Sequence, residues 1–531
     1  MSVTARACLD GSRLNRGALL GGILVLLLTV FAVAPLTYPG FFQVHSGFLP
    51  AFRVQHLSDA PKWDWAADPV RGEGQFPYLL TWPFFRLSGS GIVAVKWGYG
   101  LAFLLAALAT YAWTRPWLGT QGAVLASVVY TYLPWHLSAV YVRGAFAEAW
   151  LWALWPLIWW ALGRQAAARR IGATAVLLLA VEAAGSAQQG LALLMVLVLF
   201  FYLLVFPSRP RRLLWGVLAA AVLVAALTYV VRGAPPAPHE FTRGLLYPYQ
   251  LLMANGEFQL GLAGVGLSIA ALALWKTKGS GGADGAEGIP PVFAAPDLSA
   301  RLFHRALLFW AVVLLVVVLL TLRPSAVFWR VTGLQALLTH PWQLLAVAGL
   351  PLAFLAGSVA RLDGRLGAMP VWAGLVALVL LTGYPLLSPR FTQLDPGSEP
   401  VAMLQPADAS APSIVLLDYE VVPPSGITPT LTLTLTWQAV EPVSEDYTVF
   451  VHLLSPSDVR VAQIDVRPCA GECPTNTWRP GEILTERHSL SMPPDAPLGP
   501  YHLAVGLYRL ETGERVAVVG RQGGTVLLDV P

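Results

Sequence analysis

Long apolar runs separated by short polar links occupy the chain up to about residue 388. A helix needs about 20 apolar residues to cross the hydrocarbon layer of a bilayer, and about eleven runs reach or approach that length. They lie at 17–36, 91–113, 118–134, 146–162, 171–187, 189–206, 213–231, 258–275, 302–322, 342–360 and 368–388. The pattern predicts a polytopic α-helical membrane domain over residues 1–388.

The period of the pattern changes after Pro389. Residues 430–437 alternate threonine with an apolar residue, which is the period of two expected of a half-buried strand. Similar short runs lie at 414–421, 446–454, 459–466, 482–490, 500–509, 515–519 and 525–530. About eight strands at this spacing predict an antiparallel all-β sandwich over residues 410–531, joined to the last span by a linker at 389–409.

The composition agrees with a membrane protein. The 531 residues are 56% hydrophobic and 12% charged, with a mean hydropathy of +0.60, which a water-soluble core cannot explain. The lipid bilayer is therefore the first expected partner. The net charge is only +4 and the arginines form short clusters between apolar runs, so we expect no nucleic-acid partner.

Basic residues predict the orientation, because cytoplasmic loops of membrane proteins are enriched in lysine and arginine. The first run, 17–36, is too long for the apolar core of a signal peptide and no small-residue cleavage site follows it. We therefore expect an uncleaved multi-pass protein of the plasma (inner) membrane, with a cytoplasmic N-terminus and an extracytoplasmic C-terminal domain. The predicted cytoplasmic links contain Arg115, Arg164, Arg169, Arg170, Arg209, Arg211, Arg212, Lys276, Lys278, Arg301, Arg305, Arg361 and Arg365.

The predicted exterior first loop, residues 37–90, is polar and contains several ionisable side chains. Transfer of a sugar from a phosphate-linked donor needs a carboxylate to take the acceptor's proton and cations to hold the departing phosphate. The candidate carboxylates are Asp59, Asp64 and Asp68 in this loop and Glu148 at the edge of the 146–162 span. The candidate phosphate-binding residues are Arg53, Arg71, Arg143 and Arg330, because guanidinium donors match phosphate oxygens.

Each of these residues also has a structural interpretation. A loop carboxylate is usually only solvated, and this interpretation is the more common one for each first-loop aspartate taken singly. An ionisable group at the position of Glu148 is costly unless it is paired or lines a polar cavity. Arg143 therefore has two equally weighted roles at this point, as a structural partner of Glu148 or as part of a site.

Metal and cysteine chemistry have weaker signals. A divalent cation such as Mg²⁺ or Mn²⁺ would suit the first-loop acids together with His45, but no compact ligand motif is present and no cofactor is established. Cys469 and Cys473 are too isolated for a zinc site, and in an exterior domain they indicate a local disulfide that closes a turn. Residues 326–338 have approximate helical spacing of apolar residues, which predicts a short amphipathic helix on the membrane surface.

This order of features resembles the GT-C class of membrane glycosyltransferases. More narrowly, the chain resembles uncharacterised bacterial membrane proteins labelled as related to 6-pyruvoyl-tetrahydropterin synthase, a label that implies no pterin chemistry here. The matching stretches are residues 45–53, 141–148 and 340–343, and residues 433–508 are similar to β-sandwich domains appended to such proteins. The resemblance implies that the substrate is lined by His45, Ser46, Gln188, Gln189, His340 and Gln343.

The chain departs from the family pattern at three of these positions. Ser46 stands where an early first-loop acid is often found, Gln188 or Gln189 replaces a histidine, and Gln343 replaces an arginine. Each change removes a charge or a proton-transfer group. Either the base has moved to a first-loop aspartate or Glu148, or this branch binds its ligand without transferring a sugar.

The resemblance implies a glycosyltransferase that takes a sugar from a polyprenyl-phosphate-linked donor on the outer face. The acceptor would be a cell-envelope glycan, lipid or glycoprotein, engaged by the sandwich. The alternative is a non-catalytic membrane protein that binds lipid-linked or envelope glycan or scaffolds envelope assembly. A transporter is less well supported, because no internal inverted repeat is visible.

Overall fold

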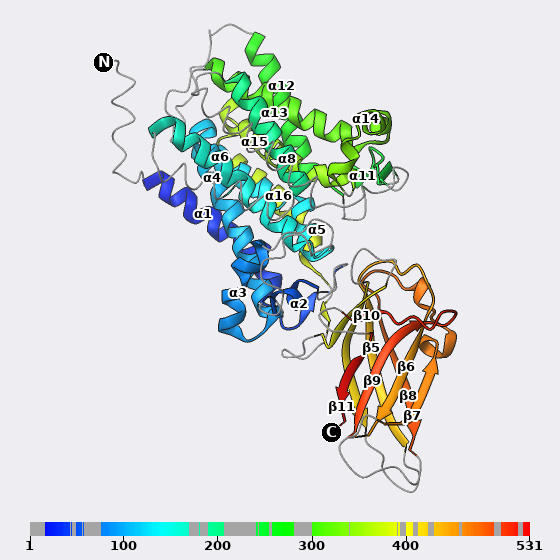
Figure 1. The fold of residues 1–531 in the computed structure, drawn as a ribbon. Coiled ribbons are helices and arrows are strands. Elements are labelled where there is room, and N and C mark those ends of the chain that lie inside the picture. The colour runs from blue at the N-terminus through cyan, green and yellow to red at the C-terminus, as the bar shows by residue number, and fades with distance from the viewer. Residues whose placement is uncertain are drawn as a thin grey trace. The chain divides into compact units, whose positions relative to one another are not determined.

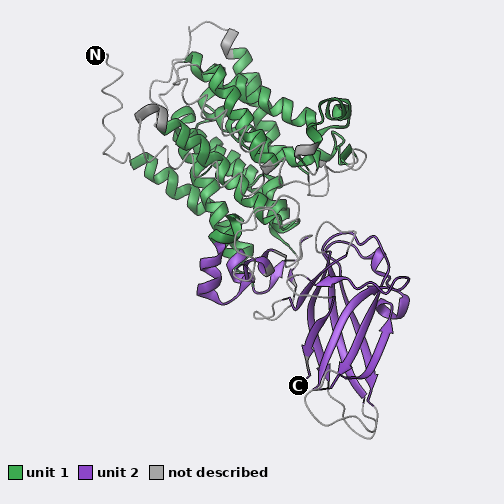
Figure 2. Cartoon of the chain, viewed as in Figure 1, with its two compact units in different colours: residues 1–38, 72–80, 96–389 green, residues 39–71, 81–95, 390–531 purple. Residues whose placement is uncertain are grey.

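The computed structural model describes residues 16–42, 44, 49–55, 57, 76–168, 180, 189–206, 241–242, 244–253, 258–280, 300–338, 340–389, 391–392, 400–406, 413–422, 430–455, 459–492, 501–518 and 524–530. The chain forms two compact units (Figure 2). The first consists of residues 1–38, 72–80 and 96–389, and the second of residues 39–71, 81–95 and 390–531. The first unit is helical, and the second contains the strands.

The helical unit contains the apolar helices (Figure 1). Its α-helices are α1 (Arg16–Val33), α5 (Pro134–Tyr141), α6 (Phe146–Ala168), α8 (Gln189–Val205), α11 (Gln250–Met253), α12 (Leu262–Ser280), α13 (Ala300–Thr321), α14 (Ala326–Thr332), α15 (Leu345–Leu362) and α16 (Met369–Gly383). Its short 3-10 helices are η2 (Ala34–Thr37), η4 (Arg323–Ser325), η5 (Leu334–Leu337), η6 (Pro341–Leu344) and η7 (Tyr384–Leu387). Helices α3 (Phe76–Ser88) and α4 (Gly91–Thr131) contribute to both units.

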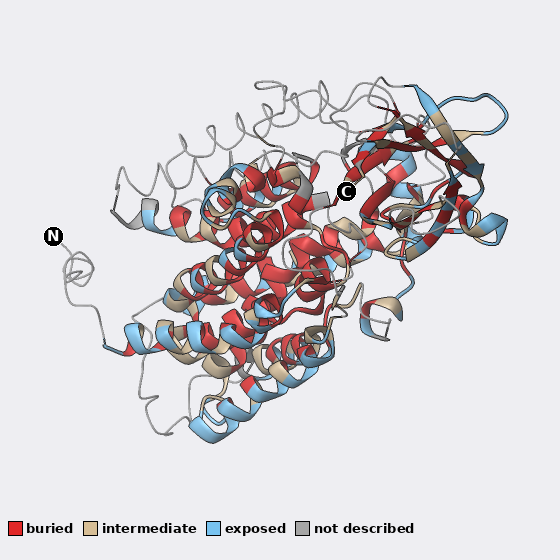
Figure 3. Ribbon diagram, turned by 90° about the horizontal axis from the view of Figure 1, so that it is seen from below, coloured by how far each residue is buried: buried red, intermediate tan, exposed pale blue. Residues whose placement is uncertain are grey.

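Helix α15 lies at the centre of the helical unit. Every residue from Leu345 to Val359 is buried, and α12 and α13 pack against this helix. At the periphery, α1 and α16 bury only one side, so that Leu20, Phe31 and Leu381 are exposed. Figure 3 shows exposed outer faces around this buried interior. Exposed apolar faces of this extent are stable against lipid and unfavourable against water.

Two glycines allow α4 and α15 to cross closely. A Cβ atom on Gly357 would lie 2.5 Å from the carbonyl oxygen of Gly122, and one on Gly122 would lie 2.8 Å from the carbonyl oxygen of Gly357. Neither position therefore has room for a side chain. Small residues at such a crossing let the two backbones gain van der Waals contact, which drives helix association inside a bilayer. The crossing holds the second half of α4 against the central helix.

Among the described residues, five segments are long and apolar enough to cross a membrane: Arg16–Thr37, Gly91–Tyr141, Ala300–Thr321, Pro341–Leu362 and Met369–Leu387. The expected runs at 91–113 and 118–134 both lie in α4, where two helices meet at Gly119, whose φ of 73° and ψ of −178° are not helical. The expected span at 213–231, and that at 171–187 apart from Ala180, lie outside the described residues. The span count of about eleven and the orientation therefore stay predictions.

The second unit contains a two-sheet antiparallel β-structure near its C-terminal end. One sheet has the strand order β10-β3-β4-β5-β8 and the other has the order β11-β9-β6-β7. The strands are β3 (Ala402–Gln405), β4 (Ile414–Val422), β5 (Thr430–Ala439), β6 (Tyr447–Leu454), β7 (Arg460–Val466), β8 (Ile483–Ser491), β9 (His502–Arg509), β10 (Ala517–Val518) and β11 (Val526–Asp529). All eight strands expected from the sequence are present, and β3 is an additional strand inside the stretch expected as a linker.

A smaller part of the second unit comes from the first loop. Strand β1 (Phe41–Phe42) pairs with β2 (Phe391–Thr392), and helix α2 (Leu49–Gln55) follows β1 in the chain. The start of α4 packs closely on α2, because a Cβ atom on Gly91 would lie 2.6 Å from the carbonyl oxygen of Ala51. The expected linker therefore contains β2 as well as β3.

The alternation of threonine with apolar residues in β5 produces the core of the sandwich. Leu433, Leu435 and Trp437 are buried, whereas the threonines between them are partly exposed. Val451 of β6 and Leu507 of β9 belong to the same buried cluster. The two sheets thus bury one face each against the other, as the period of two predicts.

A buried carboxylate lies at one edge of this core. Glu486 accepts a hydrogen bond from the indole N–H of Trp437 at 2.6 Å and one from the backbone N–H of Cys469 at 3.2 Å. The Nε2 atom of His488 lies 3.2 Å from Glu486. Cys469 and Cys473 form a disulfide with their Cα atoms 5.5 Å apart. Glu486 therefore fastens the disulfide loop to the sandwich core.

We expect Glu486→Ala to lower the free energy of unfolding of the sandwich by about 2–4 kcal/mol, because the buried indole N–H of Trp437 and the partly buried amide of Cys469 lose their acceptor. The urea midpoint of the sandwich, measured on the full chain by peptide-resolved oxidative labelling, tests this expectation. Ser489→Ala is the control, because Ser489 is an exposed residue of the same strand. Equal midpoints for the two variants would show that the carboxylate has no stabilising role.

We also expect the stability of the sandwich to depend on pH through His452. Burial lowers the pKa of His452 below its ordinary value of 6.5, Arg460 and Arg515 lower it further, and Asp465 opposes them. The unfolded chain therefore binds this proton more readily than the folded sandwich does, so the free energy of unfolding falls as the pH drops below about 6.5. We expect the free energy of unfolding of the sandwich to fall less between pH 7.5 and 5.5 in His452→Gln than in the unmodified chain. The same urea measurement, made at both pH values, tests this. An identical loss in both proteins would exclude a contribution from His452.

Candidate functional site

Helices α5 and α6 form a hairpin whose turn carries the candidate site. Gly144 in this turn has a φ of 66°, a conformation that residues with a Cβ atom rarely adopt. The amide of Arg143 donates to the carbonyl of Ser138 at 2.7 Å, and the amide of Ala145 donates to the carbonyl of Ala139 at 2.7 Å. These bonds satisfy carbonyls at the end of α5 and turn the chain so that α6 begins directly afterwards.

A buried ion pair bridges this hairpin. Arg143 Nη1 donates to Glu148 Oε2 at 2.7 Å, and Nη2 donates to Oε1 at 2.9 Å. The side chains of Arg143 and Glu148 are only 9% and 2% exposed. Glu148 also lies in the first turn of α6, where the helix dipole favours a negative charge. The two parallel charge-assisted bonds fix the plane of the guanidinium and compensate part of the desolvation cost.

Aromatic rings enclose the guanidinium of Arg143. Its central carbon lies 3.9 Å from the ring centroid of Trp135 and 5.5 Å from that of Trp342. Both indoles also contact Phe258, with centroid distances of 6.3 and 5.4 Å. His340 stacks on Trp342 at 4.9 Å with an interplanar angle of 11°. These faces attract the cation and exclude water, which strengthens every charge interaction at the site.

His136 ties the hairpin to the end of α4. Its Nδ1 donates to the carbonyl of Tyr130 at 2.6 Å, since a carbonyl can only accept. The imidazole stacks on Trp152 of α6 at 4.5 Å. The hydroxyl of Tyr130 donates to the carbonyl of Trp152 at 2.6 Å. These contacts link α4, α5 and α6, so the hairpin that carries Arg143 and Glu148 is positioned by packing as well as by the ion pair.

The N–H donor of Arg143 that lacks an acceptor in the described part of the chain indicates which ligand the site can bind. Its Nε–H has no hydrogen-bond partner among the described residues, and the indole N–H of Trp135 likewise has none there. The indole N–H groups of Trp150, Trp152, Trp155 and Trp159 on α6 share this property, so the Nε–H can accept a ligand as a partner but does not by itself require one. A phosphate oxygen is a suitable acceptor for a guanidinium edge. Glu148, by contrast, uses both oxygens to hold Arg143.

The remaining candidate residues are distributed over the chain. Arg53 is partly buried on α2, in the second unit. Arg330 is exposed on α14, with its Nε 3.4 Å from the carbonyl of Ala326 in the same helix. Gln189 begins α8. The candidates outside the described residues are His45, Ser46, Asp59, Asp64, Asp68, Arg71 and Gln188.

His340 and Gln343, two candidate substrate-lining residues, have a structural role. His340 and Gln343 form a capping box at the start of η6, in which the amide of His340 donates to Gln343 Oε1 at 3.2 Å. The box fixes the short helix that carries Trp342, which lies over Arg143. Gln343 therefore contributes to the site by positioning an aromatic ring.

Sequence reasoning did not identify Trp135, His136 or Phe258 as parts of the site. The available signal was the pair of Trp135 and His136 at the start of α5, shortly before Arg143. No group of three His, Cys, Asp or Glu side chains fit for a metal ion occurs in the described part of the chain. Binding of Mg²⁺ or Mn²⁺, which depends on the first-loop acids, stays a prediction.

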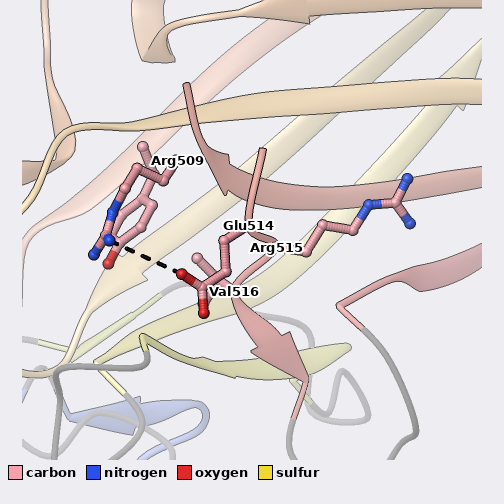
Figure 4. A pocket seen from close by; sticks show the side chains of 5 residues that line it. Arg509, Glu514, Arg515 and Val516 are labelled. Atoms are coloured by element: carbon pink, nitrogen blue, oxygen red, sulfur yellow. Dashed lines mark ion pairs between the residues drawn. The ribbon is translucent and has the colours of Figure 1, made fainter. Parts of the chain in front are cut away.

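A small surface pocket of the sandwich is a second possible site (Figure 4). It is lined by Tyr447, Arg509, Glu514, Arg515 and Val516. Arg509 forms an ion pair with Glu445 and lies 3.9 Å from Glu514. Arg515 points away from that pair, and it donates to Thr525 at 2.8 Å. Both side chains are more exposed than that of Arg143, so solvent screening makes this pocket a weaker phosphate site.

Comparison with solved structures gives distant likenesses. No family model matches the chain, and no curated protein matches it. The single-particle cryo-EM structure of arabinosyltransferase EmbB from Mycobacterium smegmatis is similar at 12% identity and a TM-score of 0.29, over 96% of this chain and 64% of that chain. A TM-score this low supports no conclusion about fold or function. The relation to proteins labelled after 6-pyruvoyl-tetrahydropterin synthase receives no support.

We expect Arg143→Met and Glu148→Leu each to lower the free energy of unfolding by about 3–5 kcal/mol, because each leaves one buried charge unpaired. The double variant removes both charges and should be more stable than either single variant. Thermal unfolding of the purified protein in detergent measures this coupling. Additive losses in the double variant would mean that the two side chains do not stabilise each other.

Proposed function

We propose that this protein is a membrane glycosyltransferase that transfers a sugar from a polyprenyl-phosphate-linked donor to a cell-envelope acceptor. The observation that supports it most is the guanidinium of Arg143, held in one orientation by Glu148 and two indoles while its Nε–H lacks a partner in the described residues. A fixed cation with an unused donor in an apolar helical unit suits the phosphate of a lipid-linked sugar.

The proposed reaction has a simple balance. An acceptor hydroxyl oxygen attacks the anomeric carbon, and the bond from that carbon to the phosphate oxygen breaks. The polyprenyl phosphate leaves with the bonding electrons, and its added negative charge is stabilised by Arg143. The hydroxyl proton passes to a carboxylate acting as general base.

Glu148 and the first-loop acids take different parts in this proposal. Both oxygens of Glu148 accept hydrogen bonds from Arg143, so Glu148 orients the cation and is a poor choice for the base. Asp59, Asp64 and Asp68 are the remaining candidates for the base. In this scheme Glu148 is a positioning residue, and one of the aspartates is catalytic.

A non-catalytic glycan-binding protein is the second candidate. It is favoured by the same closed ion pair, since a carboxylate with 2% exposure and two guanidinium bonds is well suited to a purely structural role. This candidate predicts binding of a lipid-linked sugar without turnover. Any glycosylated product formed by the purified protein would exclude it.

The decisive assay uses the full chain in liposomes with a panel of polyprenyl-phosphate-linked pentoses and hexoses. We expect release of polyprenyl phosphate, and a loss of about 100-fold or more in Glu148→Gln, which corresponds to about 2.7 kcal/mol of transition-state stabilisation. One of Asp59→Asn, Asp64→Asn and Asp68→Asn should be inactive while its Arg143–Glu148 pair remains intact.

Glu511→Gln is the matched control, because it removes a carboxylate from the exposed surface of the sandwich. It should transfer sugar at the rate of the unmodified protein. Full activity of Glu148→Gln would remove Glu148 from the mechanism, and the absence of transfer with every donor would leave the binding role as the better account.

A further inference from the structure

Helix α14 presents an apolar surface that the rest of the described helical unit leaves uncovered. Val327 and Val331 are 63% and 80% exposed, and Phe328 is also exposed. The helix is too short to cross a bilayer. A short helix with a large exposed apolar face is typical of segments that lie in the plane of the membrane interface.

One buried tryptophan fastens α14 to the protein. The indole N–H of Trp329 donates to the carbonyl of Leu320 at 2.9 Å and lies 3.1 Å from Ser325 Oγ. The ring packs against Phe241 at 5.1 Å. The exposed side chains of α14 therefore have a defined orientation, and their exposure does not result from a detached helix.

The charges and aromatic rings around α14 suit an anionic lipid headgroup. Arg330 is exposed on the helix, and the guanidinium carbon of Arg323 lies 3.9 Å from the ring centroid of Tyr247. Tyr247 stacks on Tyr249, and both tyrosines are exposed. The described residues of 241–253 and 322–338 include these two arginines and no carboxylate. Exposed tyrosines and arginines together are typical of the boundary between lipid tails and headgroups.

The position of this surface in the fold agrees with that boundary. Helix α14 follows the candidate span α13 through η4, so it starts where a membrane-crossing helix ends. The amide of Leu246 donates to the carbonyl of Thr321 at 2.9 Å, and the amide of Arg323 donates to the carbonyl of Leu246 at 3.1 Å. These bonds place the tyrosine segment beside the end of α13.

The same segment connects the surface to the candidate site. A Cβ atom on Gly244 would lie 3.0 Å from Pro341 Cδ, so the segment packs closely on the start of η6. That helix carries Trp342, which lies over the guanidinium of Arg143. A continuous path of packed residues therefore runs from α14 to Arg143.

We propose that α14, with Arg323, Arg330, Tyr247 and Tyr249, is an in-plane membrane helix that binds the phosphate headgroup of anionic lipids. The apolar side chains enter the acyl boundary and the two arginines contact the phosphate. Binding of ordinary anionic phospholipid at this surface does not depend on the proposed function. Its extension to the phosphate of a lipid-linked donor, delivered toward Arg143, rests on the proposed function.

The test uses the full chain and phosphatidylglycerol as the probe. The apparent Kd for phosphatidylglycerol, titrated into phosphatidylcholine-containing micelles and read by native mass spectrometry, should rise about fivefold in Arg330→Ala. Arg330→Lys should retain most of the affinity, because it keeps the charge. Arg365→Ala is the matched control, since it removes one exposed arginine from the turn between α15 and α16, and it should leave the Kd unchanged.

A second measurement reports the depth of the helix. In a Cys8→Ser background, a fluorophore at Val331→Cys should be quenched by shallow spin-labelled lipids in liposomes, whereas one at the exposed sandwich residue Val459→Cys should not. An unchanged Kd in Arg330→Ala, an equal effect of Arg365→Ala, or an unquenched label at residue 331 would each overturn the proposal. The assays contain no sugar donor, so their failure is separate from a failure of sugar transfer.

Discussion

The buried pair of Arg143 and Glu148 is the constraint on which the candidate site depends. Two opposite charges in an apolar helical unit are stable only when they are paired, because pairing compensates the cost of removing each charge from water. The bidentate bonds of 2.7 and 2.9 Å provide this pairing. Glycine in the α5–α6 turn, the indole of Trp135 and the ring of Trp342 then fix where the cation lies. The phosphate-binding role that we propose rests on this fixed position and on the Nε–H, which has no partner among the described residues.

Much of the architecture follows from the periodicity of the sequence. The apolar runs that lie within the described residues form helices, and the alternating segment β5 forms a strand with one buried face. Both patterns are local and repeat with the period of the backbone. The structure differs from this expectation where an element depends on partners that are distant in the sequence. Strand β3 forms because β4 and β10 offer it edges that composition alone does not reveal, whereas Gly119 separates two helices within α4 as the two apolar runs predict.

The site was only partly predictable for the same reason. Arg143 and Glu148 are five residues apart, and an ionisable residue at the edge of a span already suggests a partner. The rings that enclose them come from α5, from residue 258 and from η6, which meet only after the helices pack. Gln343 illustrates the difference: as a replaced arginine it suggested a lost function, whereas the structure uses it to cap the helix that positions Trp342.

The central claim is that Arg143 receives the phosphate of a lipid-linked sugar. The most direct measurement is an experimental structure of the full chain in lipid with a polyprenyl phosphate bound. Our account predicts a phosphate oxygen about 3 Å from Arg143 Nε, with the bonds to Glu148 retained and a first-loop aspartate facing the acceptor side. A phosphate bound elsewhere, with the Arg143–Glu148 pair enclosed by side chains alone, would contradict the account and leave the pair a structural role.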